Sequence, residues 1–331
     1  MPRILVTGGA GYIGSHTVRR LLADGHDVTV LDSLVHGHRA AVPADRLVVG
    51  DITDAPALDW LFADERPEAV VHFAAFAYVG ESVTDPAKYY ANNLVGSLAL
   101  LDACRRHGVG TFVFSSTCAT YGTPERVPIT EAEKQLPINP YGNTKLAFER
   151  ALADYAGAYP FGFCALRYFN AAGAAPDGTL GEDHDPETHL IPLVIAAATG
   201  RRPAVRVFGT DYPTPDGTCV RDYIHVDDLA EAHALALAAI RPGSALRYNV
   251  GTGRGYSVRE VIRTVEDVTG LTVPVAEAPR RPGDPAELVA DAALVRRELG
   301  WAPRYAELRS IVETAWNWHR THPDGYGDRG V

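Results

Sequence analysis

Cysteine is scarce in this chain of 331 residues. The four cysteines, Cys104, Cys118, Cys164 and Cys219, lie far apart, and no two of them form a Cys-x-x-Cys pair. Cysteine-based metal sites and disulfide frameworks need such pairs or regular spacings, and a chain of this length folds without cross-links. We therefore expect neither a disulfide scaffold nor a metal site.

Long hydrophobic runs are missing as well. No stretch of 18 apolar residues occurs, and an apolar strand begins at Ile4 without the basic start and cleavage site of a signal peptide. We expect a cytoplasmic protein that has no membrane partner.

Positive charge is in deficit, because 31 lysines and arginines face 41 aspartates and glutamates, for a net charge of -10. A general attraction to nucleic acid is therefore disfavoured, and any anion must be held locally. Only Lys88, Lys134 and Lys145 are lysines, which makes each of them worth inspection. With 46% hydrophobic residues the chain can bury a large core, either as two domains or as one α/β domain with an added lobe.

The first 170 residues alternate between short apolar runs and segments of helical length. The apolar runs are residues 3–7, 28–31, 47–49, 69–73 and 111–114, and the helical segments are residues 12–24, 55–64 and 87–107. Strands without a polar face must be buried on both sides. The pattern predicts an α/β fold with a doubly wound parallel sheet of the Rossmann type.

The character of the sequence changes after Asn170, where stretches rich in glycine and proline separate shorter elements. A helix over residues 226–239 and a strand over 247–251 nevertheless look able to return to the main sheet. We therefore predict a nucleotide-binding domain of residues 1–170 plus about 223–251. A smaller, discontinuous α/β lobe of about 171–222 plus 252–331 would bind the substrate.

The segment TGGAGYIG at residues 7–14 places Gly8, Gly11 and Gly14 between the first strand and the first helix. Glycine permits positive φ and a close approach to a pyrophosphate, and the helix N-terminus offers free N–H groups. A glycine triplet alone is weak support for a nucleotide site, but here it has the strand and helix on either side that such a site requires.

Two acidic residues follow the next strands. Asp32 ends the second strand, where a carboxylate can accept hydrogen bonds from an adenosine ribose and would repel a 2′-phosphate, so NAD is favoured over NADP. Asp51 follows the third strand and suits a hydrogen bond to the adenine amino group. The alternative for Asp51 is a helix N-cap, a role for which Asp54 competes.

Residues 141–145 read YGNTK, which places Tyr141 and Lys145 one helical turn apart on one face, after a helix-starting Pro140. A nearby ammonium stabilises a phenolate and brings the tyrosine towards the working range of a general base. A Tyr/Lys pair alone occurs by coincidence in many helices. Here the fifth strand ends in Ser115, Ser116 and Thr117, at the edge where open sheets bind ligands.

Together the motifs TGGAGYIG, HFAAFAYVGES, FSST, YGNTK, LRYFNAAG and VRDYIHVDDLA resemble the extended short-chain dehydrogenase/reductases. More narrowly, they resemble the UDP-glucose 4-epimerase family, and the similarity spans nearly the whole chain. The resemblance implies a bound NAD that is used and regenerated within each turnover. Tyr141 would take the proton of the sugar 4-hydroxyl, Lys145 would bind the nicotinamide ribose and polarise Tyr141, and Thr117 would donate to the sugar oxygen.

The same resemblance implies two sets of binding residues. The NAD contacts, with those of the glycine turn, are Gly8, Gly11, Tyr12, Ile13, Gly14, Asp32, Ser33, Asp51, Ile52, Phe73, Ala74, Ala75, Asn92, Ser115, Tyr141, Lys145 and Phe169. The UDP-sugar contacts are Thr117, Asn170, His189, Leu190, Val207, Phe208, Arg221, Arg281, Asp284 and Leu288. An arginine fork suits a diphosphate.

The chain departs from the family pattern at three positions. Ala77 stands where a lysine commonly contacts the cofactor, which puts tight NAD retention in doubt. His189 replaces a common asparagine; it would either donate to the diphosphate region or cap the following helix. Leu288 is intermediate between the tyrosine of members that reject N-acetylated sugars and the small residue of those that accept them.

Several alternatives stay open. UDP-xylose and UDP-arabinose 4-epimerases share HFAAFAYVGES and SSTCATYG, so a UDP-pentose substrate is an alternative to UDP-galactose and UDP-glucose. A non-catalytic NAD sensor is another, although it would not need Tyr141. A dehydratase is excluded, because Cys118 and Ala119 stand where that chemistry needs an Asp-Glu pair. The family commonly forms homodimers through helices that here would be about 87–107 and 141–158.

Overall fold

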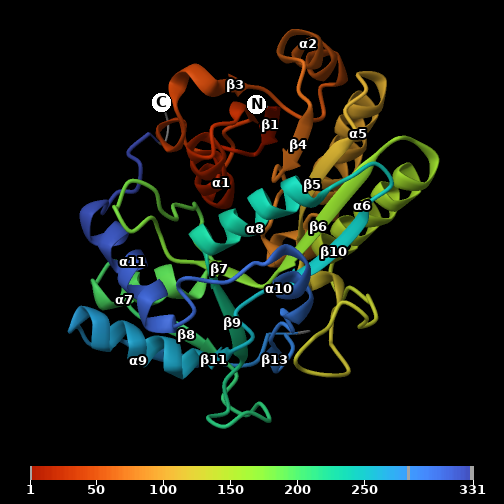
Figure 1. Ribbon diagram of the computed structural model, residues 1–331. Coiled ribbons are helices and arrows are strands. Elements are labelled where there is room, and N and C mark those ends of the chain that lie inside the picture. The colour runs from red at the N-terminus through yellow and green to blue at the C-terminus, as the bar shows by residue number, and fades with distance from the viewer. Residues whose placement is uncertain (1, 282–283, 329–331) are drawn as a thin grey trace.

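The computed structural model describes residues 2–281 and 284–328 of the chain. Its centre is a parallel sheet of seven strands in the order β10-β6-β5-β4-β1-β2-β3 (Figure 1). The strands are β1 (Arg3–Thr7), β2 (Asp27–Asp32), β3 (Leu47–Val49), β4 (Ala69–His72), β5 (Thr111–Thr117), β6 (Gly162–Tyr168) and β10 (Ala245–Val250). The doubly wound Rossmann sheet is thereby confirmed. The chain winds outwards from β1 in both directions, so the strand order reverses between β1 and β4.

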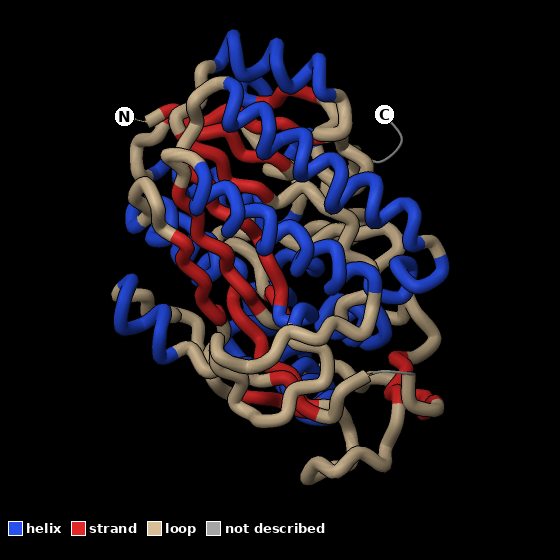
Figure 2. The backbone as a smooth tube through the Cα atoms, turned by 90° about the vertical axis from the view of Figure 1, so that its right-hand side faces the viewer, coloured by secondary structure: helices blue, strands red, loops and turns tan. Residues whose placement is uncertain are grey.

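Helices cover both faces of this sheet (Figure 2). One face carries α1 (Tyr12–Ala23), α8 (Val226–Ala239) and α10 (Ala293–Leu299), and the other carries α2 (Ala55–Glu65), α5 (Ser97–Arg106) and α6 (Pro140–Ala158). On β1, Ile4 and Val6 belong to the core under α1 and α8, whereas Leu5 belongs to the core under α2, α5 and α6. Successive side chains of a strand point to opposite faces, which is why these strands are apolar throughout.

The predicted helix over residues 87–107 is interrupted. It consists of α4 (Pro86–Tyr89), a π-helical segment η3 (Tyr90–Gly96) and α5, and it follows the short helix α3 (Val79–Thr84). Inside η3 the buried Asn93 accepts a hydrogen bond from the Phe76 amide (2.9 Å) and donates one to the Phe76 carbonyl (2.8 Å). The widened turn thus binds the segment that follows β4, an effect of tertiary contact that helical periodicity does not reveal.

The remaining residues build a second lobe below the main sheet in Figure 1. Its larger sheet has the order β11-β9-β13 with β7 also paired to β9, and its smaller sheet pairs β12 with β8. These strands are β7 (Asn170–Ala172), β8 (Val205–Phe208), β9 (Val220–His225), β11 (Gly255–Ser257), β12 (Val275–Ala278) and β13 (Glu287–Leu288). A third core packs the helices α7 (Leu190–Ala198), α9 (Val258–Thr269) and α11 (Leu308–Thr321) together.

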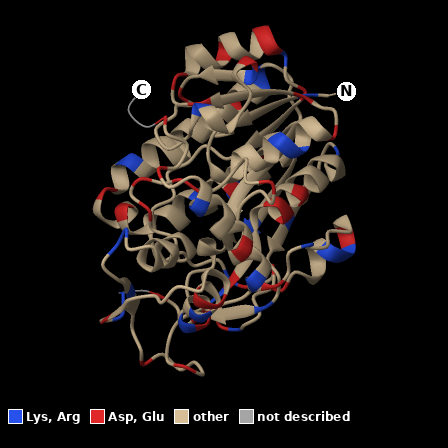
Figure 3. Cartoon of the chain, turned by 90° about the vertical axis from the view of Figure 1, so that its left-hand side faces the viewer, with Lys and Arg blue, Asp and Glu red and all other residues tan. Residues whose placement is uncertain are grey.

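In the part of the chain that the structure describes, three 3-10 turns complete the elements: η1 (Arg39–Ala41), η2 (Ala44–Arg46) and η4 (Cys118–Thr120). The four cysteines are free thiols, as the sequence predicts. Acidic and basic residues are interspersed over the face shown in Figure 3. Within residues 2–281 and 284–328, no helix combines the length and apolarity needed to cross a membrane.

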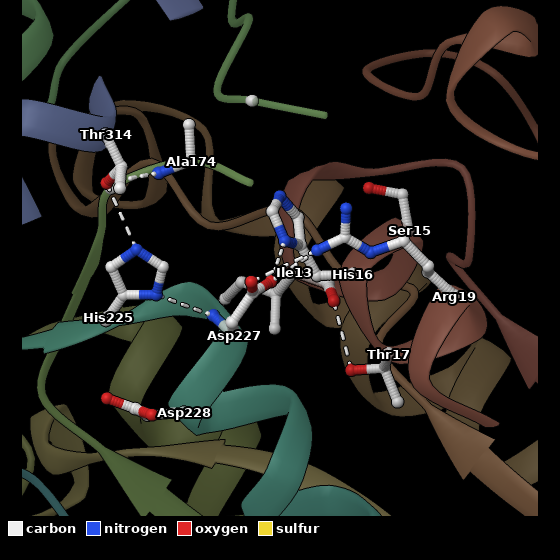
Figure 4. Close-up of polar contacts among 12 residues, drawn as sticks. Ile13, Ser15, His16, Thr17, Arg19, Ala174, His225, Asp227, Asp228 and Thr314 are labelled. Carbon is white, nitrogen blue, oxygen red and sulfur yellow. Dashed lines mark hydrogen bonds and ion pairs between the residues drawn. The ribbon is translucent and has the colours of Figure 1, made fainter. Parts of the chain in front are cut away.

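A polar cluster fixes α8 against α1 (Figure 4). The Nδ1 atom of His16 lies 2.6 Å from Oδ1 of Asp227, and Arg19 donates to both Asp227 oxygens at 2.9 and 3.1 Å. At the start of α8, the Asp227 amide donates to Nδ1 of His225, whose Nε2 lies 3.1 Å from the Thr314 hydroxyl of α11. This cluster joins α1 and α8, which pack on the main sheet, to α11 of the second lobe.

Candidate active site

The glycine turn lies between β1 and α1 and is closely packed. Gly8 has a φ of +72°, and a Cβ there would lie 2.5 Å from the Ala74 amide nitrogen, at the end of β4. A Cβ on Gly14 would lie 2.2 Å from the Gly8 carbonyl oxygen. Gly11 is the N-cap of α1 and supplies no side-chain cap. The turn therefore leaves main-chain N–H groups at the helix start available to an anion, as a pyrophosphate site requires.

Asp32 lies beside this turn at the end of β2 and is only 7% exposed. One carboxylate oxygen accepts a hydrogen bond from the Ala10 amide (2.9 Å), and the other accepts one from the Leu34 amide (2.8 Å). Burial raises the pKa of Asp32, while these two bonds lower it. The carboxylate thus braces the turn, and its remaining lone pairs can still accept from a ribose hydroxyl.

The other predicted NAD contacts come mainly from the ends of neighbouring strands. The amides of Phe73 and Ala74 both donate to the Thr7 carbonyl, which holds the end of β4 against the glycine turn. Ala75 follows directly, and the exposed Ala77 comes two residues later. Tyr12 and Ile13 open α1, and the Tyr12 hydroxyl donates to the Gly173 carbonyl (2.7 Å).

Two acidic residues after β3, Asp51 and Asp54, are both candidates for the N-cap of the next helix. Asp54 caps α2 by accepting a hydrogen bond from the Ala57 amide (3.0 Å). Asp51 instead binds the amide and hydroxyl of Thr53, both at 2.8 Å, and its side chain is exposed. Ile52 is buried and Ser33 is exposed, and Asn92 lies in η3 with its amide on Asn93 (2.9 Å). The capping alternative for Asp51 is therefore wrong.

Tyr141 and Lys145 lie in the first turns of α6, as predicted. Asn139 caps this helix by accepting a hydrogen bond from the Gly142 amide (2.8 Å), and Pro140 begins it. Tyr141 is 8% exposed and Lys145 is 3% exposed. The Lys145 ammonium donates to the main-chain carbonyl of Ser115 (2.9 Å), in the last part of β5. The tyrosine, the lysine and the end of β5 are thus brought together.

The electrostatics of this pair differ from the expectation. Burial raises the pKa of Tyr141 well above its ordinary value, and only a hydrogen bond with the side chain of Thr117 opposes it. Burial also lowers the pKa of Lys145 to about 7, against the pull of Glu149. Lys145 Nζ lies 5.9 Å from the Tyr141 ring centre, and desolvation outweighs any stabilisation of the phenolate in the protein alone. The predicted lowering of the tyrosine pKa by this lysine is therefore wrong for the protein by itself.

A buried ionic network behind Lys145 was not predicted. Glu149, one turn further along α6, pairs with Arg167 of β6, and both side chains are at most 2% exposed. Arg167 also donates to the Tyr121 hydroxyl (2.9 Å). The sequence offers a signal for it, because a charged residue stands inside the otherwise apolar strand GFCALRY. A second unpredicted contact joins the hydroxyls of Ser115 and Tyr168 at 2.6 Å.

Part of the predicted UDP-sugar set gathers around β9. Asn170 donates from its side chain to the Asp222 carbonyl (3.0 Å), Arg221 pairs with Asp284, and Leu288 of β13 lies in register with Arg221. Phe169, Leu288 and Cys118 pack in one apolar cluster. The end of β5 is thereby joined to the second lobe through the side chains of Phe169 and Leu288.

The rest of the predicted set occupies two other places. Val207 and Phe208 end β8, and the Arg281 guanidinium lies 3.9 Å from the centre of the Phe208 ring. His189 and Leu190 lie at the start of α7. His189 occupies the N-cap position, but its side chain makes no capping hydrogen bond; it faces Glu182 and Glu187. His189 is therefore the N-cap residue of α7, but its side chain does not cap the helix.

A parallel sheet that reverses its strand order beside a glycine turn, with a tyrosine and a lysine at the same edge, defines a nucleotide-dependent α/β enzyme. The model of the NAD dependent epimerase/dehydratase family matches residues 4–251. The chain belongs to this family.

Individual relatives are similar over their full length. A UDP-glucose 4-epimerase of Lacticaseibacillus casei is 51% identical over 328 residues, which covers 98% of this chain and 99% of the relative. The crystal structure of UDP-glucose 4-epimerase from Brucella ovis in complex with NAD is 54% identical, with a TM-score of 0.92 over 96% of this chain and 98% of that one. The structure from Bifidobacterium longum in complex with NAD+ and UDP is 40% identical, with a TM-score of 0.93 over 98% and 100%. The resemblance seen in the sequence motifs is confirmed.

Proposed function

We propose that this protein is an NAD-dependent UDP-sugar 4-epimerase that interconverts UDP-galactose and UDP-glucose. One observation carries the proposal: Tyr141 and Lys145 are buried together against the end of β5, at the edge of the sheet that also holds the glycine turn. Because β1, β4 and β5 are parallel neighbours, their carboxyl ends meet at that edge. A proton-transferring group and a dinucleotide site thus face the same crevice.

The residues present fit NAD. The glycine turn offers free main-chain donors for the pyrophosphate, and Asp32 offers an acceptor for the adenosine ribose while its charge opposes a 2′-phosphate. Asp51, Ile52, Asn92 and Phe73–Ala75 would border the adenine and its neighbours, and Ser115, Tyr141, Lys145 and Phe169 would border the nicotinamide end. Bound NAD supplies a hydride acceptor that returns the hydride within the same turnover.

The chain's own groups would handle the proton. The Tyr141 phenol is the acid/base for the sugar 4-hydroxyl, and Thr117, 7% exposed at the end of β5, donates to the same oxygen. Burial holds Tyr141 protonated in the protein alone, so the base must form inside the complete complex, where added positive charge favours the phenolate. Lys145 positions the ribose and Tyr141 through its fixed contact with Ser115.

The second lobe would hold the UDP part. Arg221 and Arg281 supply guanidinium groups for the diphosphate, and Asp284 forms an ion pair with Arg221. Asn170, His189, Leu190, Val207, Phe208 and Leu288 complete the proposed contacts. Epimerisation needs this end to stay anchored while the hexose turns over, and guanidinium groups suit that anchoring. The NAD-binding domain would thus comprise residues 1–170 plus about 223–251, and the UDP-sugar-binding lobe about 171–222 plus 252–331.

The test is a reaction without added NAD. Purified protein is incubated with UDP-galactose, and the sugar nucleotides are followed by chromatography. Conversion to UDP-glucose is expected, because the cofactor is regenerated in each turnover. Stoichiometric formation of NADH would point to a dehydrogenase, and the absence of turnover with any UDP-sugar would favour the sensor. A parallel reaction with UDP-arabinose compares the pentose alternative, which the names of the relatives do not favour.

We further propose a cytoplasmic homodimer that meets through η3, α5 and α6. Tyr90 and Val95 of η3 are 41% and 61% exposed, and η3 packs beside α6. Exposed apolar side chains on one surface are typical of a subunit interface. Light scattering coupled to gel filtration should give twice the monomer mass for the natural chain and the monomer mass for Val95→Glu. A monomeric natural chain would contradict this assembly.

A further inference from the structure

Four ligand-type side chains converge in the loop that leads into α7. Glu182, His184, Glu187 and His189, here called the His/Glu cluster, each present one nitrogen or oxygen atom, and these four atoms lie within 4.8 Å of one another. The loop itself is held in place, because its main-chain carbonyl at Glu182 accepts from the Trp318 indole (3.2 Å). Imidazole and carboxylate together are a ligand set that suits divalent transition metals.

Four nitrogen–oxygen distances in the cluster are close to those between ligands of one metal ion. The Glu182 Oε1 atom lies 3.3 Å from His184 Nδ1 and 2.7 Å from His189 Nδ1. The Glu187 carboxylate lies 3.7 Å from His184 Nδ1 and 3.0 Å from His189 Nδ1. Four tetrahedral ligands at zinc bond lengths of about 2.0–2.1 Å lie roughly 3.3 Å apart, which falls in the middle of these distances.

Two of the converging atoms are buried and have polar partners only inside the cluster. Glu182 is 3% exposed, and its Oε1 atom and Nδ1 of His184 contact other members of the cluster as ion pairs but make no well-aligned hydrogen bond among the described residues. Burying polar atoms in this state is costly, and native structures rarely do it. A cation between the four residues would satisfy both atoms at once.

The surroundings also orient the ligands. The amides of Thr188 and His189 both donate to Glu187 Oε1 at 2.7 Å, which fixes that carboxylate. The ring of His184 meets the rings of Tyr12 and Tyr78 edge-on, at centre distances of 6.1 and 6.4 Å. Such supporting contacts hold ligands in place at metal sites. Two carboxylates also balance the charge of one divalent ion when both imidazoles are neutral.

We propose that Glu182, His184, Glu187 and His189 bind one divalent transition-metal ion, for which zinc fits best. The ion would hold together the loop that leads into α7 at Leu190. This loop packs against Tyr12, at the start of α1, through His184. Its role is structural. His189 is also one of the proposed UDP-sugar contacts, so the test measures metal binding directly and does not depend on the proposed epimerase activity. The expectation of no metal site weighed only the cysteines, whereas this cluster contains none.

Metal binding is tested directly on the full chain without an affinity tag. The protein is treated with a chelator and dialysed, and Co²⁺ is then titrated while the visible spectrum is recorded, followed by Zn²⁺ in a calorimeter. We expect one ion per chain, a visible band from four-coordinate Co²⁺ that Zn²⁺ abolishes, and a rise in Tm with Zn²⁺. Glu182→Gln and His184→Ala should each weaken binding at least 10-fold.

The controls are the same substitutions elsewhere: Glu313→Gln on α11 and His107→Ala after α5 should bind Zn²⁺ as the natural chain does. Glu182→Gln keeps the size of the side chain, so it serves if His184→Ala does not fold. A flat titration of the natural chain would overturn the proposal and leave the cluster as a set of ion pairs. Undiminished one-to-one binding by both folded cluster variants would overturn it as well.

Discussion

The ammonium of Lys145 is fixed on the main chain of β5 by its hydrogen bond to the Ser115 carbonyl (2.9 Å). The bond joins α6 to the strand end that carries Thr117, so the helix and the sheet edge hold the reacting groups in one arrangement. Because the partner is a backbone atom, no substitution at Ser115 removes it. The side chains of Tyr141 and Lys145 are therefore the points at which this arrangement can be tested.

Replacing Tyr141 with phenylalanine should lower kcat by about 10²–10⁴-fold, because it removes the acid/base hydroxyl and keeps the ring. Nucleotide binding should stay nearly unchanged, since the ring still fills its buried position. Steady-state kinetics with UDP-galactose and the NAD content of the purified protein measure both quantities. Tyr159→Phe, at the end of the same helix, is the matched control and should keep full activity. Near-normal turnover of Tyr141→Phe would remove this residue from the mechanism.

Lys145 should make the cofactor-free protein less stable as the pH falls. Its pKa is about 7 in the folded protein and has its ordinary value of 10.5 when the chain is unfolded, so the unfolded state binds more protons between these values. The free energy of unfolding should therefore rise with pH from about 7 to 10, by at most about 1.4 kcal/mol per pH unit from this group. Urea unfolding at several pH values measures it.

The matched variants for this prediction are two Lys→Met substitutions. Lys145→Met should flatten the dependence on pH, whereas Lys134→Met, whose side chain is 70% exposed, should keep it. If the natural chain and Lys145→Met change in parallel, Lys145 does not titrate in this range.

The buried pair of Glu149 and Arg167 should be costly to break. Arg167→Met leaves the buried Glu149 carboxylate with only the longer contact to Arg247 Nε at 3.8 Å, and breaking a buried pair costs about 3–5 kcal/mol of unfolding free energy. The same change at Arg309, whose ion pair with Glu313 is 60% and 51% exposed, should cost less than about 1 kcal/mol. Urea unfolding of both variants checks the difference, and equal losses would be inconsistent with a special role for the buried pair.

Alanine should be tolerated at some glycines and not in the nucleotide turn. At Gly14 the added Cβ would lie 2.2 Å from a backbone oxygen, so Gly14→Ala must displace the turn and should abolish NAD retention. At Gly157 on α6 a Cβ meets nothing within 4 Å, and alanine there should stabilise the helix by about 0.5–1 kcal/mol. Bound NAD and thermal unfolding distinguish the two variants. Normal NAD content in Gly14→Ala would show that the turn can adapt.

Variants of Arg281 and its neighbour Arg280 should differ, because Arg281 is a proposed substrate contact and Arg280 forms an ion pair on the surface. Loss of one charged hydrogen bond to the diphosphate costs about 1.5–3 kcal/mol, so Arg281→Ala should raise KM for UDP-galactose about 10–100-fold. Arg280 pairs with the exposed Asp211 and lies over Tyr212, and Arg280→Ala should leave KM within about 2-fold. Equal KM values for the two variants would contradict the assignment of Arg281.

Local sequence was enough for the strands and for the start of the site. The apolar runs predict β1 to β4 within one residue at each end, because strands buried on both faces cannot carry polar side chains. The sequence pattern did not reveal β6, whose apolar run contains Arg167. It also predicted a single helix where the structure has α4, η3 and α5. Both errors concern polar groups whose partners are distant in the chain: Glu149 for Arg167, and Phe76 for Asn93.

By itself the sequence determined the Rossmann sheet, the glycine turn and the pairing of Tyr141 with Lys145 on one helical face. These features follow from apolar periodicity, from glycine's missing side chain and from the helical repeat, all of which act within a few residues. Only the tertiary structure decided how the site is charged and held. Burial set the pKa values of Tyr141 and Lys145, and the return of the loop before α7 gathered Glu182 and His189. Desolvation and convergence depend on what surrounds a side chain, and that surrounding exists only after the chain has folded.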